Sequence, residues 1–249
     1  MLTPGEWERY DRQMLIREVG PEGQQRLRQA KIVIAGVGGL GSAVAFYLVA
    51  AGVGTVRIID QDTVVLSNLN RQVLHWTEDL GQCKVLSAAE KLKRLNPLVD
   101  IEALDRTITE ENLPALVSGF DLVVDALDNL PDRFLLNRAA LDQGLPLFHG
   151  AVRAFEGRVM TVIPGQTACL GCVYHGTRSE ERSPVIGATA AVIGSLQATE
   201  VIKHILGIGR LLTDRCILFD GLNLRFTELT VNRNPDCPHC GNSERRAES

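Results

Sequence analysis

Two groups of residues in the first third of the chain have the chemistry to bind and activate a phosphate. The first is the glycine-rich run GVGGLGS at 36–42, which follows the apolar run KIVIA. Glycines spaced as Gly36, Gly38 and Gly41 let the backbone approach a phosphate at a helix N-terminus, where N–H groups and the helix dipole favour anions. Asp60, at the end of the next apolar run, can accept hydrogen bonds from ribose hydroxyls. This pattern indicates an adenosine nucleotide, and by itself it favours NAD over ATP.

The second group reverses that preference. The stretch from Asp62 to Lys84 is rich in donors and cations, which hydride transfer does not need because that reaction builds no charge at the phosphates. Attack on a phosphorus atom does build charge there, and positive groups and hydrogen-bond donors stabilise it. The side chains of this kind are Asn68, Arg71, Gln72 and Lys84. They favour ATP that is cut at a phosphorus atom.

Asp128 follows the apolar run DLVVDAL at 121–127. In α/β folds ligands bind beyond the carboxyl ends of the strands, and a carboxylate there can hold Mg²⁺. The alternative interpretation is that Asp128 caps the helix predicted to follow. The residue type and position are compatible with either role, a Mg²⁺ ligand or a helix cap.

Four of the six cysteines form two C-x-x-C pairs, namely Cys169 with Cys172 and Cys237 with Cys240. Two such knuckles offer the four thiolates of a tetrahedral zinc site, and the glycines and proline around them favour loops over a thioredoxin-like helix start. The alternative is one redox pair and one unrelated pair. Cys83 is interpreted as a small buried residue.

Patterns of apolar residues predict an α/β fold with one large domain. Helical spacing of apolar residues predicts an amphipathic arm over 1–30. The chain then alternates between short β-branched runs and helical patterns, which predicts a mainly parallel sheet with flanking helices, and it ends in antiparallel strands. Strands are expected at 31–36, 55–60, 99–104, 121–127, 146–152, 157–163, 215–220 and 225–231, and helices at 40–51, 84–95, 109–117, 132–144 and 188–207. The tail at 242–249 is expected to be disordered.

Composition excludes some classes of function. The chain has 249 residues, 45% of them hydrophobic, and a net charge of −4. The sequence has no cluster of Lys and Arg that would favour nucleic acid, no apolar run long enough to span a membrane and no apolar leader segment. We therefore expect a cytoplasmic protein with no nucleic-acid or membrane partner.

Several motifs together resemble the MoeB/ThiF/HesA family, the bacterial relatives of ubiquitin-activating enzymes. The motifs are RYDRQ at 9–13, GVGGLGS at 36–42, LSNLNRQ at 66–72, GQCK at 81–84, DALDN at 125–129, the two C-x-x-C pairs and IGSLQATE at 193–200. The resemblance implies a Rossmann-like domain over 31–241, with a nucleotide-binding part at 31–152 and a carrier-binding, zinc-containing part at 153–241. It also implies ATP-dependent adenylation of the C-terminal glycine of a small ubiquitin-like sulfur carrier that ends in Gly-Gly, with release of pyrophosphate.

The resemblance also implies roles for individual residues. Gly38, Gly39 and Gly41 would line the nucleotide loop, Asp60 would bind the ribose, and Asn68, Arg71, Gln72 and Lys84 would surround the phosphates. Asp128 would bind Mg²⁺, and the four cysteines would bind a structural Zn²⁺. Arg12 would reach into the partner's site across a homodimer, whereas its residue type alone indicates a solvated face of the arm. A separate sulfur donor would later convert the acyl-adenylate to a thiocarboxylate.

One departure from the family concerns covalent chemistry. Some relatives place a cysteine between the first zinc pair and the GSLQ helix, but here that stretch contains only Ser179 and Ser183 as candidates. A thioester or persulfide at that position is therefore not expected. Two alternatives remain, a tRNA-modifying dehydratase of the same superfamily and an NAD-binding oxidoreductase or silent scaffold. The resemblance implies a carrier of the molybdopterin-synthase or thiazole-synthesis type.

Overall fold

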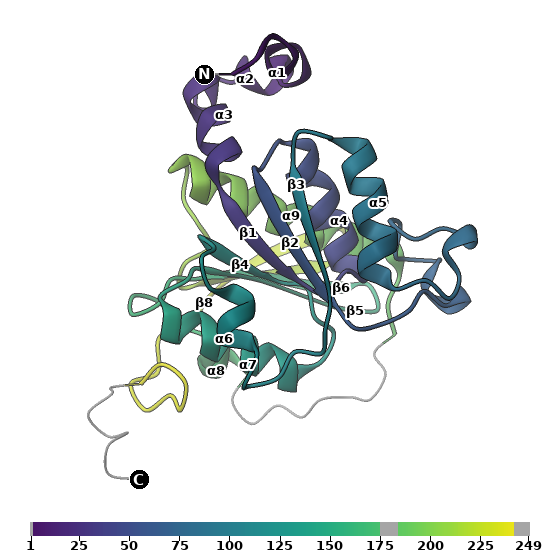
Figure 1. Ribbon diagram of the computed structural model, residues 1–249. Coiled ribbons are helices and arrows are strands. Elements are labelled where there is room, and N and C mark those ends of the chain that lie inside the picture. The colour runs from purple at the N-terminus through teal and green to yellow at the C-terminus, as the bar shows by residue number, and fades with distance from the viewer. Residues whose placement is uncertain (1, 175–183, 242–249) are drawn as a thin grey trace.

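A computed structural model describes residues 2–174 and 184–241 (Figure 1). Ser179, Ser183 and the tail at 242–249 lie outside these ranges. Within them, one sheet runs through the molecule in the order β3-β2-β1-β4-β5-β6-β7-β8. The strands are β1 (Lys31–Ala35), β2 (Thr55–Asp60), β3 (Asp100–Asp105), β4 (Leu122–Asp125), β5 (Leu147–Arg153), β6 (Glu156–Val162), β7 (Arg215–Asp220) and β8 (Arg225–Thr230).

The first five strands are parallel and the last three are antiparallel. This confirms the predicted α/β class with an antiparallel C-terminal portion. The two parts are continuous, because β5 pairs in parallel with β4 and antiparallel with β6. The short apolar strands β1 and β4 are buried at nearly every position, as expected for parallel strands covered on both faces.

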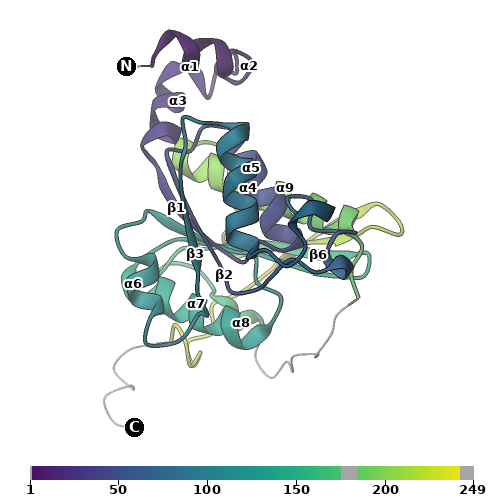
Figure 2. The ribbon, with the colours of Figure 1, turned by 45° about the vertical axis from the view of Figure 1, so that its right-hand side comes forward.

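Helices cover both faces of the sheet. One layer contains α4 (Gly39–Ala50), α5 (Lys84–Leu95) and α9 (Gly187–Leu206), and the other contains α6 (Leu113–Val117), α7 (Leu130–Gln143) and α8 (Leu170–Val173) (Figure 2). Two short 3₁₀ helices, η1 (Leu66–Asn68) and η2 (Thr77–Asp79), lie in the connection between β2 and α5. Both α7 and α9 end on a glycine in the left-handed conformation, which closes the last turn without a Cβ clash.

One predicted helix is shorter than expected. The sequence pattern predicted a helix over 109–117, but α6 begins only at Leu113. The Thr109 N–H donates to Asn112 Oδ1, and the Asn112 N–H donates to Thr109 Oγ1. These reciprocal side-chain bonds stabilise a turn in place of the first helical turn.

The N-terminal arm consists of three helices, α1 (Pro4–Arg9), α2 (Asp11–Met14) and α3 (Gly20–Gln29). Figure 1 shows the arm beyond the end of the sheet at which β1 begins. Several contacts anchor it there, among them the bond from Arg9 to the Leu95 carbonyl at the end of α5 and the bond from Asn96 to the Tyr10 hydroxyl. The arm therefore lies at the edge opposite the carboxyl ends of the parallel strands.

Helix α9 is part of the core. Its Gly194 packs so closely on α4 that a Cβ there would lie 2.7 Å from the Leu40 carbonyl oxygen. Ile193, Ala198 and Val201 are buried in the same cluster. None of the helices in the described residues combines the length and apolar character needed to cross a bilayer.

Candidate active site

The glycine-rich turn between β1 and α4 is shaped by close backbone contacts. Gly36 has a φ of +90°, and a Cβ on it would lie 2.7 Å from the Ala126 carbonyl oxygen. A Cβ on Gly41 would lie 1.9 Å from the Gly36 carbonyl oxygen. Only glycine fits these positions, so the first turn of α4 packs directly against the end of β1.

Asp60, at the end of β2, contacts this turn. Its Oδ2 accepts a hydrogen bond from the Val37 N–H at 2.8 Å, and its Oδ1 accepts one from the Asp62 N–H at 2.9 Å. Burial raises the pKa of Asp60, while Lys84 and the two N–H donors oppose that change. Each carboxylate oxygen has a second lone pair, so Asp60 can still accept a hydrogen bond from a ribose hydroxyl.

An open surface depression of about 520 Å³ lies at the carboxyl ends of β2 and β3, and its lining begins at Gln61, the residue after Asp60. Polar side chains surround it. They are Gln61, Asp62, Asp105, Arg106, Thr107, Thr109 and Asn112. It lies at the carboxyl-end side of the sheet, on which α/β folds bind ligands, two strands from the point between β1 and β4 at which the strand order reverses.

Lys84 is the first residue of α5, and its side chain is buried. Its ammonium nitrogen lies 2.7 Å from Asp62 Oδ2. Asp62 was not among the residues selected from the sequence, although its place two residues after Asp60 could have signalled that both carboxylates leave the end of β2. The structure therefore places Lys84 and Asp60 at the same edge of the sheet, with Asp62 between them.

The segment after β2 returns to the glycine-rich turn. An ideal Cβ on Gly38 would lie 3.5 Å from Gln72 Nε2, and one on Gly39 would lie 3.6 Å from Arg71 Cγ. Arg71 donates from one guanidinium nitrogen to the carbonyl of Ser67. The structure thus brings two of the four predicted donors directly against the turn.

The amides of Gln72 and Asn68 are both buried. Gln72 Oε1 has no hydrogen-bond partner among the described residues, whereas Asn68 Oδ1 accepts from the Val65 N–H. A buried acceptor without a partner is uncommon and is expected where a ligand completes a site. Phosphate oxygens cannot donate to it, so Gln72 could reach a phosphate only through its Nε2.

Asp128 lies in the turn between β4 and α7 and is exposed. The helix cap is Asn129, whose side chain accepts from the Asp132 N–H at 2.9 Å, so the capping interpretation of Asp128 is wrong. The turn is fixed because Arg133 donates to the Leu127 carbonyl. Within the described residues the exposed Asp128 carboxylate does not cap α7, and it lies at the carboxyl end of β4.

Arg12 is exposed on α2 in the N-terminal arm. Within one copy of the chain it lies at the opposite edge of the sheet from the glycine-rich turn. It cannot contribute to the site of its own chain in this arrangement.

The four paired cysteines come together between α8 and the segment after β8. All four sulfur atoms lie within 4.8 Å of one another, and the Cys169–Cys237 and Cys172–Cys240 sulfur distances are 3.7 and 3.5 Å. A tetrahedral zinc with Zn–S bonds of about 2.3 Å requires sulfurs about 3.8 Å apart. The donor set and its spacing therefore fit Zn²⁺.

Backbone donors stabilise two of these sulfurs. The Asn234 N–H donates to Cys172 Sγ and the His239 N–H donates to Cys237 Sγ. Burial raises the pKa of Cys169, so zinc binding must displace a proton from that thiol.

Cys83 and two histidines lie outside the zinc cluster. Cys83 is half-buried, which corrects its interpretation as a buried residue, and its Sγ donates to Asp105 Oδ2 at 3.3 Å. His149 is fully buried between Asp125 and Tyr174, and His75 is buried beneath the glycine-rich turn. Sequence patterns gave no signal for these buried contacts.

Comparisons with known proteins agree with the fold and the motifs. The ThiF family matches residues 10–239. A "Sulfur carrier protein adenylyltransferase" of Thermus thermophilus is 45% identical over 99% of this chain and 95% of its own length. The "SAMP-activating enzyme E1" of Haloferax volcanii is 40% identical over 96% of this chain and 91% of its own length.

Among solved structures, E. coli MccB has a similar fold. Its TM-score is 0.84 at 24% identity, over 95% of this chain and 75% of MccB. The chain belongs to the ThiF family, the MoeB/ThiF/HesA group that its motifs resemble.

Proposed function

We propose that this protein is an adenylyltransferase that joins AMP from ATP to the C-terminal glycine of a small ubiquitin-like sulfur carrier. The names of the two curated relatives support the reaction class and the class of carrier. The carrier's carboxylate oxygen attacks the α-phosphorus, the bond to the bridging oxygen breaks and pyrophosphate leaves. The product is an acyl-adenylate, which a separate sulfur donor protein converts to a thiocarboxylate in the synthesis of a sulfur-containing cofactor such as molybdopterin or thiamin.

The observation that carries the proposal is the contact between the glycine-rich turn and the segment at 68–72. Gln72 and Arg71 lie against Gly38 and Gly39, at the N-terminus of α4. Both reactants are anions, so their approach requires positive charge and donors at this position. A redox dinucleotide would not require a guanidinium there.

In this mechanism the chain's own groups bind and orient the nucleotide. The N–H groups of the turn bind phosphate oxygens, Asp60 accepts hydrogen bonds from the ribose, and the polar depression that begins at Gln61 would receive the base. Asn68 donates from its amide NH₂. Lys84 and Arg71 stabilise the negative charge that grows on the leaving pyrophosphate.

Two metal ions and a second copy of the chain complete the proposed enzyme. Asp128 would hold Mg²⁺, which offsets phosphate charge when bound. Zn²⁺ at the four cysteines would join α8 to the C-terminal segment. Arg12 would act in the partner's site in a homodimer, because it lies too far from the site of its own chain.

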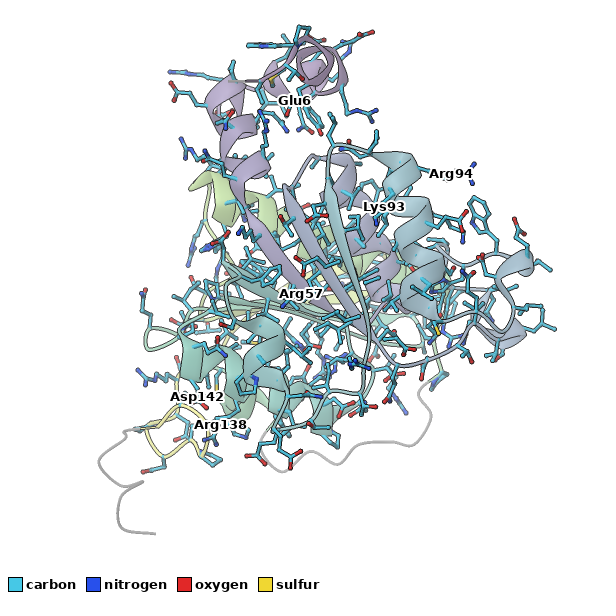
Figure 3. The ribbon with its side chains drawn as sticks, viewed as in Figure 1. Glu6, Arg57, Lys93, Arg94, Arg138 and Asp142 are labelled. Carbon is cyan, nitrogen blue, oxygen red and sulfur yellow. The ribbon has the colours of Figure 1, made fainter. Side chains whose placement is uncertain are left out.

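Isotope exchange between pyrophosphate and ATP, measured with Mg²⁺ and a panel of carriers that end in Gly-Gly, tests the proposal. We expect exchange to require one carrier and to fall at least about a hundredfold in Arg71→Ala and in Asp128→Ala. Matched controls are Arg94→Ala and Asp142→Ala, which change exposed residues on α5 and α7 (Figure 3). The proposal fails if no carrier supports exchange, or if the controls lose as much activity as the site variants.

A further inference from the structure

His75 is a buried imidazole between the glycine-rich turn and α5, and the mechanism above gives it no role. Only 3% of its surface is exposed. Its Nε2 lies 3.0 Å from the Val37 carbonyl oxygen, and its Nδ1 lies 2.8 Å from the Ser87 hydroxyl. Both ring nitrogens are therefore fully engaged, one of them by the backbone of the turn.

These partners define which nitrogen carries the proton. A carbonyl oxygen only accepts, so Nε2–H donates to Val37 and Nδ1 accepts from the Ser87 hydroxyl. The Ser87 oxygen in turn accepts from the Lys91 ammonium at 3.1 Å. Lys91 is anchored by a buried ion pair with Asp79 at 2.6 Å. The result is a directed chain of hydrogen bonds that begins at α5 and ends at the turn.

The charge state agrees with this chain. Burial is the largest cause and lowers the pKa of His75; the Val37 hydrogen bond and Asp79 oppose it, the cations Lys84 and Lys91 add to it, and the net direction is downward. The imidazole is therefore neutral near pH 7, with a single proton that the Val37 carbonyl oxygen accepts.

The consequence concerns the peptide bond between Val37 and Gly38. In a trans peptide the C=O and the following N–H point in opposite directions. His75 binds the Val37 carbonyl oxygen at 3.0 Å and the Ser42 hydroxyl donates to the same oxygen at a longer 3.4 Å, so the Gly38 N–H must face the other side. That N–H has no hydrogen-bond partner within residues 2–174 and 184–241. The Val37 N–H donates to Asp60. The peptide before Val37 is therefore held by Asp60, and the peptide after Val37 is held by a different residue, His75.

We propose that His75 is a positioning residue for the nucleotide, which holds the Val37–Gly38 peptide so that the Gly38 N–H points at a phosphate oxygen. Ser87 selects the tautomer that makes this possible, and the Lys91–Asp79 pair holds Ser87. The inference rests on the proposed nucleotide site, and it adds a residue that touches neither ATP nor the carrier.

A pair of nearly isosteric variants isolates the hydrogen bond. His75→Gln keeps an N–H donor close to the Nε2 position, whereas His75→Met fills similar space without one. We expect calorimetric titration with MgATP to show affinity about tenfold weaker in the Met variant and within about threefold of the parent in the Gln variant, as for loss of one hydrogen bond. Carrier affinity should be unchanged in both.

Controls separate positioning from general stability. His204→Met changes a half-buried histidine at the far end of α9 and should leave MgATP affinity unchanged. Nitrogen NMR of the parent protein should show protonated Nε2 and unprotonated Nδ1 on His75. This measurement needs no variant to fold, and the opposite tautomer would overturn the inference.

Two failures can be told apart. A parent protein that is folded but does not bind MgATP would refute the proposed nucleotide site, and the inference with it. The other failure leaves MgATP binding by the parent intact. If the Met and Gln variants then bind MgATP equally well, or lose affinity for MgATP and for the carrier alike, only the positioning role of His75 is refuted.

Discussion

The Lys84 ammonium nitrogen lies 2.7 Å from Asp62 Oδ2, and the two partners differ sharply in burial. The Lys84 side chain is 6% exposed, whereas that of Asp62 is 59% exposed. A phosphate oxygen could therefore replace the Asp62 carboxylate as partner of Lys84 without leaving an unpaired charge buried, because water can solvate Asp62. The ion pair keeps Lys84 extended toward the end of β2 at modest cost to nucleotide binding.

This relationship predicts the effect of removing the cation. Lys84→Met should lower the rate of ATP–pyrophosphate exchange about a hundredfold, because one charge-stabilising group is lost at the phosphates. Stability should change only modestly, since the Asp62 carboxylate that remains is exposed and Asp60 keeps its two N–H donors after losing the nearby cation. Steady-state exchange and thermal unfolding measure the two effects. The matched control Lys93→Met, at an exposed position on α5, should keep full activity; a Lys84 variant that does the same would contradict the assigned role.

The glycine-rich turn predicts a steric effect. A methyl group on Gly41 would lie 1.9 Å from the Gly36 carbonyl oxygen, so Gly41→Ala must push α4 away from β1. We expect the free energy of unfolding to fall by about 3 kcal/mol or more and nucleotide binding to be lost. Gly5→Ala is the control, because nothing lies within 4 Å of its Cβ position. Denaturant unfolding of both variants measures this effect. If Gly41→Ala is as stable as Gly5→Ala, the turn can relax around the added methyl group and the steric prediction is wrong.

Zinc binding predicts a further difference between cysteines. Cys240→Ser should remove one of four ligands, lower the zinc content from one ion per chain and lower the melting temperature. Cys83→Ser should leave zinc content unchanged, since Cys83 contacts Asp105 and lies outside the cluster. Metal analysis with thermal unfolding tests both variants. Full zinc occupancy in Cys240→Ser would count against the site. So would a parent protein that purifies without zinc and is as stable as the same protein after zinc is added.

Much of this structure could be predicted from the sequence because its signals are local. The β-branched runs, the glycine spacing and the C-x-x-C pairs each place their residues within one element or one turn, and the structure has them there. Asp128 was ambiguous because it lies next to Asn129, and either residue type can cap a helix. Only the observed hydrogen bond from the Asp132 N–H to Asn129 decides between them.

The residues that sequence patterns missed depend on contacts between distant segments. His75 reaches Val37 across 38 positions, and His149 reaches Asp125 across 24. No periodicity predicts such pairs, because they arise from packing of α5 and the β strands. Asp62 is different, since its position beside Asp60 was visible in the sequence but its partner Lys84 was not.

The buried histidines predict how stability changes with pH. Burial lowers the pKa of both His75 and His149 in the folded protein. In the unfolded chain an imidazole has a pKa of about 6.5, so below that pH the unfolded state binds protons that the folded state does not. The free energy of unfolding should therefore fall as the pH falls below about 6.5, by up to about 1.4 kcal/mol per pH unit for each histidine.

Urea unfolding between pH 8 and pH 5.5 measures this slope. Asp60 contributes with the opposite sign because burial raises its pKa, so the histidine contribution is best isolated as a difference between the parent and His149→Gln. The variant should be less stable at pH 8 but should show a shallower loss on acidification. Parallel slopes for the two proteins would mean that His149 does not titrate on unfolding.

The most direct test of the central claim is pyrophosphate exchange with two forms of one carrier, one with a free C-terminal glycine carboxylate and one with that carboxylate amidated. If the carboxylate attacks the α-phosphorus, exchange will occur with the free carrier only, and an adduct of carrier and AMP will be detected by mass spectrometry. Exchange with the amidated carrier, or carrier-dependent release of ADP instead of AMP, would contradict adenylation of the terminal glycine.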